Sequence, residues 1–134
     1  MVNGSRGELP GVLLVDDDDA VRATLADLLR YLGCEVIEAR GGAEALLLAR
    51  RQGARLRVAL VDMNLPGMSG REVCRRLKGL MPDLPLVLIT GYDVGDLLDT
   101  SARYLLEKPF GIKTLASVLQ RLGVPLSLDV VQAA

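Results

Sequence analysis

Short runs of apolar, often β-branched residues alternate along the chain with longer segments in which apolar residues recur at helical spacing. The short runs predict buried strands and the longer segments predict amphipathic helices. The predicted strands cover residues 11–16, 34–39, 57–63, 84–90 and 102–107. The predicted helices cover 20–33, 41–53 and 69–80, then a short one over 93–99, and a last one within 108–123 after an opening turn. In the first helix we expect an apolar face made of Val21, Leu25, Leu28, Leu29 and Leu32.

Strict alternation of strand and helix predicts a parallel sheet with helices on both faces. Five such units predict an α/β fold with a doubly wound five-stranded parallel sheet, strand order 2-1-3-4-5, of the flavodoxin-like type. The segment predicted for the fourth helix is short and contains Gly95, so we expect a shortened fourth helix. We expect one domain over residues 11–123, with an N-terminal tail over 1–10 and a C-terminal tail over 124–134.

Composition narrows the classes of function. The chain has 134 residues, 16 of them basic and 17 acidic, and its net charge of −1 argues against direct binding to nucleic acid or to an anionic membrane. The chain contains no histidine, which excludes His-based acid–base catalysis and excludes the chain as a histidine phosphodonor. No apolar run reaches the roughly 18 residues of a membrane span, so we expect a cytoplasmic protein.

Polar side chains stand at the ends of several predicted strands. Asp16 and Asp17 end the first strand, Asp62 the third and Thr90 the fourth, and Lys108 follows the fifth. In a doubly wound sheet the carboxyl ends of the strands share one edge, and strands 1 and 3 are neighbours there. Converging carboxylates need a cation, and oxygen ligands suit Mg²⁺. With a lysine and a hydroxyl beside them, they predict a phosphoryl-transfer site whose nucleophile is Asp62.

The first strand is followed by four consecutive aspartates, residues 16–19. The last two fall where a helix is predicted to begin, so N-capping and the helix dipole account for Asp18 and Asp19. The run therefore divides into a pair at the predicted metal site and a pair that opens a helix.

Four stretches, in this order and each at a predicted strand end, resemble the receiver domain of response regulators in two-component phosphorelay signalling, of the chemotaxis-regulator-like type. They are "LLVDDDDAVR", "ALVDMNLPGMSG", "LVLITGYD" and "LLEKPF", and the resemblance covers residues 11–123. It implies that Asp62 accepts a phosphoryl group from the phosphohistidine of a sensor histidine kinase or a histidine phosphotransfer protein. It also implies that phosphorylation changes the binding of an output partner, which the sequence does not identify, and a homodimer is a further expectation.

The same resemblance implies a role for each site residue. Mg²⁺ would be bound by the side chains of Asp17 and Asp62, by the backbone carbonyl of Asn64, and by Asp16 through a water molecule. Thr90 and Lys108 would contact the phosphoryl group, Gly91 would leave room for it, and the bond before Pro109 would be cis. No enzymatic activity is implied beyond self-catalysed phosphoryl acceptance and autodephosphorylation.

Two features depart from the family pattern. Thr90 and Lys108 are 18 positions apart, whereas typical members have about one more helical turn of about 3.6 residues. The aromatic switch residue is usually three positions before the lysine, where this chain has Leu105; Tyr104 is one position earlier, and a shift of one residue changes the face of a strand. A bulge could restore the face, and Tyr92 is another candidate for the aromatic role.

Two other functions stay open. A degenerate receiver would bind a partner without phosphorylation, which the altered fourth helix and fifth strand favour. A haloacid-dehalogenase-like phosphatase also uses a strand-1 aspartate, a threonine and a lysine. The frame from Asp16 to Asp18 lacks the threonine or valine of that signature, however, because Ala20 stands in its place.

Overall fold

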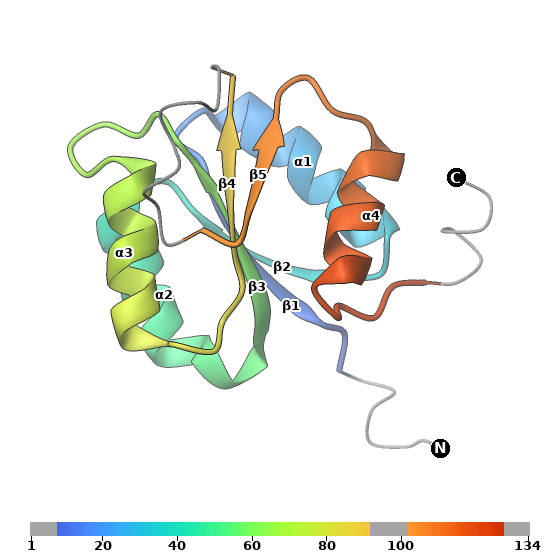
Figure 1. Ribbon diagram of the computed structural model, residues 1–134, viewed down its shortest axis with the longest axis horizontal. Helices are drawn as coiled ribbons and strands as arrows, with labels where there is room; N and C mark the ends of the chain where they lie inside the picture. Colours follow the sequence, from blue (N-terminus) through green and yellow to red (C-terminus); the bar gives the residue numbers. More distant parts are fainter. Residues whose placement is uncertain (1–7, 92–101, 128–134) are drawn as a thin grey trace.

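The computed structural model describes residues 8–91 and 102–127, which form a sheet with helices on both faces (Figure 1). The strands are β1 (Gly11–Val15), β2 (Glu35–Ala39), β3 (Leu56–Asp62), β4 (Leu86–Thr90) and β5 (Tyr104–Glu107). The helices are α1 (Asp19–Tyr31), α2 (Gly42–Gln52), α3 (Gly70–Leu80) and α4 (Ile112–Arg121), and a 3-10 turn, η2 (Gly53–Arg55), follows α2.

The five strands lie in the order β2-β1-β3-β4-β5, and every neighbouring pair is parallel, so the predicted topology is confirmed. The central strands β1 and β3 lie side by side, and Val15 near the end of β1 is paired with Val61 of β3. This register brings the residues after β1 next to the last residue of β3, where the candidate site lies.

The sheet separates two hydrophobic cores. Helices α2 and α3 cover one face, and α1 and α4 cover the other (Figure 1). Alternate residues of each central strand supply the two cores: Leu13 and Val61 point toward α2 and α3, whereas Leu14 and Leu60 point toward α1 and α4. Because these strands are buried on both faces, they carry the continuous apolar runs seen in the sequence.

Helix α1 begins as predicted, and most of its expected apolar face is confirmed: Leu25, Leu29 and Leu32 are buried, and Leu28 packs against the same core. Asp18 is the N-cap, its carboxylate accepts a hydrogen bond from the amide of Val21 at 3.0 Å, and Asp19 lies in the first turn. The prediction that Val21 belongs to the apolar face was wrong, because this side chain is 40% exposed. The buried residues of the helix are Arg22, Leu25, Ala26 and Leu29. A charged residue thus occupies the first buried position of α1.

Two further predictions concern the fourth helix and the C-terminal tail. The shortened fourth helix predicted over 93–99 lies outside the described residues, and α4 is the helix predicted within 108–123. Chain packing continues past residue 123, because Val124 is buried and the amide of Ser127 donates to the carbonyl of Leu32 at 2.9 Å. The first residues of the segment expected to be a tail therefore pack on the domain, and the domain boundaries themselves stay predictions.

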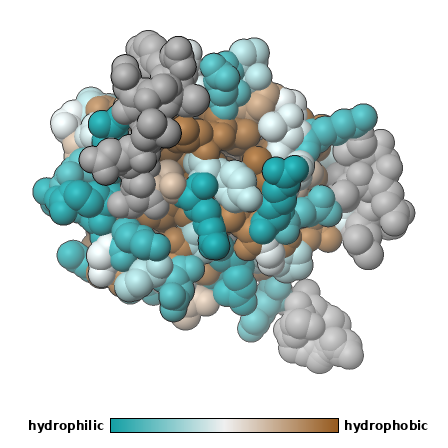
Figure 2. All heavy atoms as spheres, viewed as in Figure 1, coloured by the Kyte–Doolittle hydropathy of each residue, from teal (hydrophilic) through white to brown (hydrophobic). Residues whose placement is uncertain are grey.

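Polar side chains cover much of the face seen in Figure 2, and hydrophobic residues are visible between them. The large hydrophobic side chains exposed in the described part of the chain are Leu9, Val21, Tyr31, Leu47 and Leu80. None of the helices in residues 8–91 and 102–127 is long and apolar enough to cross a membrane.

Candidate functional site

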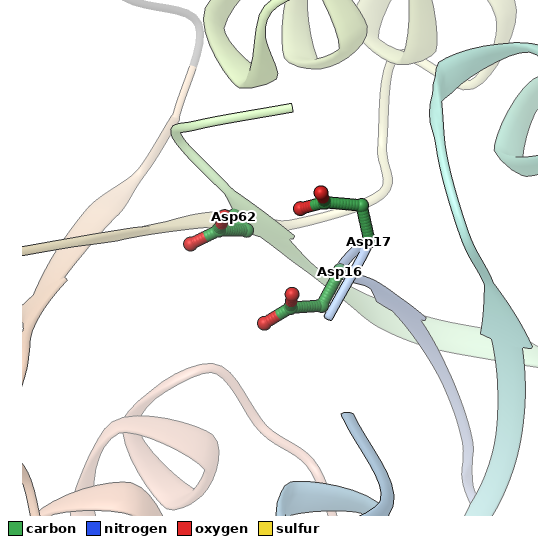
Figure 3. A group of neighbouring side chains, drawn as sticks. All are labelled: Asp16, Asp17 and Asp62. Atoms are coloured by element: carbon green, nitrogen blue, oxygen red, sulfur yellow. The ribbon is translucent and has the colours of Figure 1, made fainter. Parts of the chain in front are cut away.

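Three carboxylates converge at the carboxyl ends of β1 and β3. Asp16 and Asp17 follow β1, and Asp62 is the last residue of β3 (Figure 3). One carboxylate oxygen from each residue lies within 4.8 Å of the other two. Asp16 and Asp62 are buried, whereas Asp17 is exposed. The three residues belong to one cluster, open to solvent on the side of Asp17.

The carboxyl group of Asp16 has a shifted pKa. Burial raises the pKa of its carboxyl group above the ordinary value, and the charges of Asp62 and Asp17 raise it further, against the lowering effect of the Asp18 amide and of Lys108. Its Oδ1 accepts a hydrogen bond from the Asp18 amide at 2.9 Å. Its Oδ2 is buried and has no hydrogen-bond partner among the described residues.

An unpaired buried oxygen costs about 1–3 kcal/mol, and a water molecule held by a bound cation is the kind of partner that would remove this cost. The donor set consists of oxygens alone and is open on one side, which suits Mg²⁺ with its retained waters. The residues of the cluster therefore fit a magnesium ion.

Lys108 approaches the cluster from the end of β5. Its Nζ lies 3.1 Å from Oδ1 of Asp62, and its backbone amide donates to the carbonyl of Thr90 at 2.8 Å. The side chain of Lys108 is 37% exposed and that of Asp62 only 8%, so the ammonium lies between a buried carboxylate and solvent. The peptide bond between Lys108 and Pro109 is cis, the isomer that the resemblance implied.

The remaining polar candidates surround this group. Thr90 is buried at the end of β4, Gly91 follows it and is exposed, and Asn64 is exposed in the loop after β3. A Cβ at Gly91 would meet nothing within 4 Å among the described residues, so packing does not require glycine there. The roles expected for these three residues stay predictions.

Of the two aromatic candidates, only Tyr104 falls in the described part of the chain. Tyr92 lies outside the described residues. The register between β4 and β5 runs without a shift from the pair Val87–Tyr104 to the pair Thr90–Glu107. Tyr104 packs in the core under α1 and α4, whereas Leu105 packs in the core under α2 and α3 together with Leu88. Since side chains alternate along β4, Thr90 belongs to the face of Leu88, opposite to Tyr104.

Two residues that shape the site were missed by the sequence reasoning. Gly70, the first residue of α3, donates its amide to the carbonyl of Met63, and a Cβ on it would collide with the backbone of Asp62. Arg22 of α1 donates to the backbone carbonyl of Asp16 at 2.8 Å. A glycine at the start of a helix, where it is a poor helix former, and an arginine at helical spacing from buried residues were the available signals.

A shallow apolar groove lies beside Lys108, between α1 and the residues that follow β5. Its volume is about 410 Å³, and its lining includes Val21, Thr24, Leu28, Lys108, Pro109 and Phe110. The exposed side chain of Val21 therefore contributes to an apolar surface that is continuous with the site.

Comparison with protein families gives a match over most of the chain. The model of the family described as "Response regulator receiver domain" matches residues 12–120. The match includes β1 to β5 apart from the first residue of β1, and every residue of the candidate site.

The relatives that match this chain are proteins of different kinds. A cyclic di-GMP phosphodiesterase of Thermotoga maritima is 36% identical over 108 residues, which are 78% of this chain and 28% of that protein. The sensor kinase CckA of Brucella abortus is 33% identical over 115 residues, which are 83% of this chain and 12% of that protein. This chain thus spans well under half the length of these two relatives.

Among solved structures, the response regulator TrrA from Thermotoga maritima, in complex with Mg²⁺ and BeF, superposes with a TM-score of 0.79 at 27% identity. The superposition covers 85% of this chain and 99% of that one.

Proposed function

Because the chain belongs to the family of response regulator receiver domains, we propose that it is a phospho-accepting signalling switch. Asp62 receives a phosphoryl group from a phosphohistidine of a partner protein, and the phosphorylated domain changes its binding to an output partner. The observation that carries this proposal is the placement of Asp62. It is buried at the end of β3, clustered with Asp16 and Asp17, and its Oδ1 lies 3.1 Å from the ammonium of Lys108.

The step transfers a phosphoryl group from a phosphoramidate, the phosphohistidine, to a carboxylate, which becomes a mixed anhydride. A carboxylate oxygen of Asp62 attacks phosphorus and forms an acyl phosphate, while the P–N bond of the phosphohistidine breaks and its electron pair stays on the imidazole, which takes up a proton. Lys108 pairs with a phosphoryl oxygen and loses its contact with free Asp62. The hydroxyl of Thr90 donates to another phosphoryl oxygen, and Gly91 leaves space beside it.

The cluster of Asp16, Asp17 and Asp62 fits Mg²⁺, because the buried Oδ2 of Asp16 lacks a partner among the described residues. We assign the side chains of Asp17 and Asp62 and the backbone carbonyl of Asn64 as ligands, with Asp16 acting through a bound water. When bound, the ion neutralises phosphoryl oxygens that would otherwise be repelled by three carboxylates. The complex of TrrA with Mg²⁺ and BeF supports the choice of metal.

The donor is a sensor histidine kinase or a histidine phosphotransfer protein. Its phosphohistidine must approach Asp62 from outside the domain, and the apolar groove beside Lys108 offers a surface for its docking. We propose a cytoplasmic location and no direct contact of this chain with nucleic acid or with a membrane. A homodimer is also part of the proposal. The name phosphodiesterase belongs to a relative of which this chain covers 28%, and for this chain we propose no activity beyond accepting and releasing its own phosphoryl group.

A second candidate function is a receiver that binds its partner without phosphorylation. The position of Tyr104 favours this candidate. Tyr104 packs on the face of the sheet opposite to Thr90, so a movement of the Thr90 hydroxyl would not be coupled directly to this aromatic ring.

Beryllofluoride, which mimics the phosphoryl group, separates these two candidates. With Mg²⁺ present, the switch predicts changes in backbone amide resonances at Thr90 and Lys108 that extend into β5 and α4. Changes confined to residues next to Asp62 would favour phosphorylation-independent binding and would contradict the switch.

A further inference from the structure

Arg22 is a buried charged residue that none of the roles above uses. It lies in the first turn of α1, is 8% exposed, and turns its guanidinium toward the loop between β1 and α1. A buried arginine normally has every donor satisfied, because an unpaired buried charge is strongly unfavourable. Its partners therefore show what the residue holds in place.

Each nitrogen of this guanidinium has an acceptor on a different segment. Nη1 donates to the backbone carbonyl of Asp16 at 2.8 Å, Nε donates to Oε1 of Glu38 on β2 at 3.0 Å, and Nη2 donates to Oδ1 of Asp19 at 2.8 Å. The other oxygen of Glu38 accepts from Arg30 at 3.2 Å. The planar fork is thus fixed from two sides by carboxylates and directed at one backbone carbonyl.

The backbone carbonyl of Asp16 lies at the start of the loop that joins β1 to α1, residues 16–18. On its other side, the amide of Asp16 donates to the carbonyl of Ala39 at 3.1 Å, and its Oδ1 accepts from the amide of Asp18. With the Arg22 contact added, the backbone of Asp16 is held from β2 and from α1. The path of this loop sets the direction of the Asp16 and Asp17 carboxylates toward Asp62.

We propose that Arg22 is the positioning residue of the metal site, acting through the backbone of Asp16 and not through its charge. The inference rests on the proposed function, since it concerns the affinity of the acid cluster for Mg²⁺. Hydrogen-bonding partners behind the ligands of a metal commonly change its affinity 10- to 100-fold when they are replaced, and we expect about a 10-fold effect here.

An electrostatic role and a positioning role of Arg22 predict opposite changes in Mg²⁺ affinity when the residue is replaced. Removing a positive charge near three carboxylates favours binding of a cation, so a purely electrostatic Arg22 predicts tighter Mg²⁺ binding in Arg22→Gln. A positioning Arg22 predicts weaker binding. Arg22→Lys keeps the charge but loses the fork, because one ammonium cannot donate in the three directions that the guanidinium serves.

The test is the dissociation constant for Mg²⁺, measured by following backbone amide resonances of the folded protein during a Mg²⁺ titration, with the melting temperature of each variant recorded separately. The matched control is Arg30→Gln, which removes the same charge from the same helix and from the same Glu38 but leaves the Asp16 carbonyl bonded. We expect both Arg22→Gln and Arg22→Lys to weaken Mg²⁺ binding about 10-fold, and Arg30→Gln to change it less than twofold.

Three results overturn the inference: unchanged or tighter Mg²⁺ binding in Arg22→Gln, full rescue by lysine, or equal weakening in Arg30→Gln. A lower melting temperature with an unchanged dissociation constant would mean that Arg22 only stabilises the fold. If Arg22→Gln does not fold, Arg22→Lys decides by the same criterion. Failure of the wild-type protein to bind Mg²⁺ would instead contradict the proposed function.

Discussion

Replacing Gly70 by alanine tests how closely α3 must approach the backbone of Asp62. An ideal Cβ on Gly70 would lie 2.8 Å from the carbonyl carbon of Asp62 and from Cα of Met63, and closer still to the Asp62 carbonyl oxygen. Ordinary contacts of a Cβ begin near 3.4 Å, so the two segments must separate by at least 0.6 Å, the difference between these distances. The colliding atoms are backbone atoms, which cannot turn aside as a flexible side chain could.

Gly79, near the end of the same helix, is the matched control, because a Cβ there meets nothing within 4 Å among the described residues. Alanine in place of a helical glycine stabilises by about 0.5–1 kcal/mol, since the unfolded chain loses freedom. Gly70→Ala has the same gain but also an overpacking cost of about 1–3 kcal/mol. The two variants should therefore differ by about 1–3 kcal/mol in their free energy of unfolding, with Gly79→Ala the more stable.

Urea unfolding followed by far-ultraviolet circular dichroism is the assay, because the chain has no tryptophan to report by fluorescence. With a urea dependence of about 2 kcal/mol per molar, the midpoints of the two variants should differ by about 0.5–1.5 M. Equal midpoints would mean that α3 and the backbone of Asp62 are not in rigid contact. If Gly70→Ala folds, its displaced Asp62 should also accept a phosphoryl group more slowly, up to about 100-fold for a shift near 1 Å.

Three further predictions follow from the charges and thiols. Without metal, Asp17→Asn should raise the free energy of unfolding by up to about 1 kcal/mol, because it relieves carboxylate repulsion, and a fall in melting temperature in the presence of EDTA would count against a strained cluster. Arg75 and Arg76 lower the pKa of Glu72 to about 2. The stability that Glu72 contributes is therefore present above its unfolded pKa and lost as pH falls toward 2, so Glu72→Gln should destabilise at pH 7 but not near pH 2, and a constant difference would contradict this. Burial raises the pKa of Cys34 to about 11 and that of Cys74 to about 12, so neither thiol should react with Ellman's reagent at pH 8 until urea unfolds the chain, and fast reaction of the native protein would argue against their burial.

Much of the fold could be predicted because one pattern repeats along the chain. Strands buried on both faces read as unbroken apolar runs, and their alternation with amphipathic segments leaves few topologies other than the one observed. The cluster of Asp16, Asp17 and Asp62 followed from the same topology, because a parallel sheet gathers the residues after each strand at one edge.

The parts that could not be predicted depend on contacts between segments distant in sequence. Arg22 counts as polar in any periodic pattern, yet it is buried, because Glu38, Asp19 and the Asp16 carbonyl accept hydrogen bonds from its guanidinium. Val21, the apolar residue beside it, is exposed. Gly70 owes its importance to the backbone of Asp62, eight positions earlier and in another element. The face of Tyr104 depended on whether β5 contains a bulge, which only the pairing with β4 could decide.

The most direct test of the proposed switch is the identity of the residue that becomes phosphorylated. The protein is incubated with acetyl phosphate and Mg²⁺, and the phosphoryl group is located by peptide mass spectrometry, with Asp62→Asn treated in parallel. A phospho-accepting switch predicts one phosphoryl group on Asp62 in the wild-type protein, none in Asp62→Asn, and none when EDTA removes the metal. A phosphoryl group on Asp16, as a haloacid-dehalogenase-like phosphatase would give, or undiminished labelling of Asp62→Asn, would contradict it.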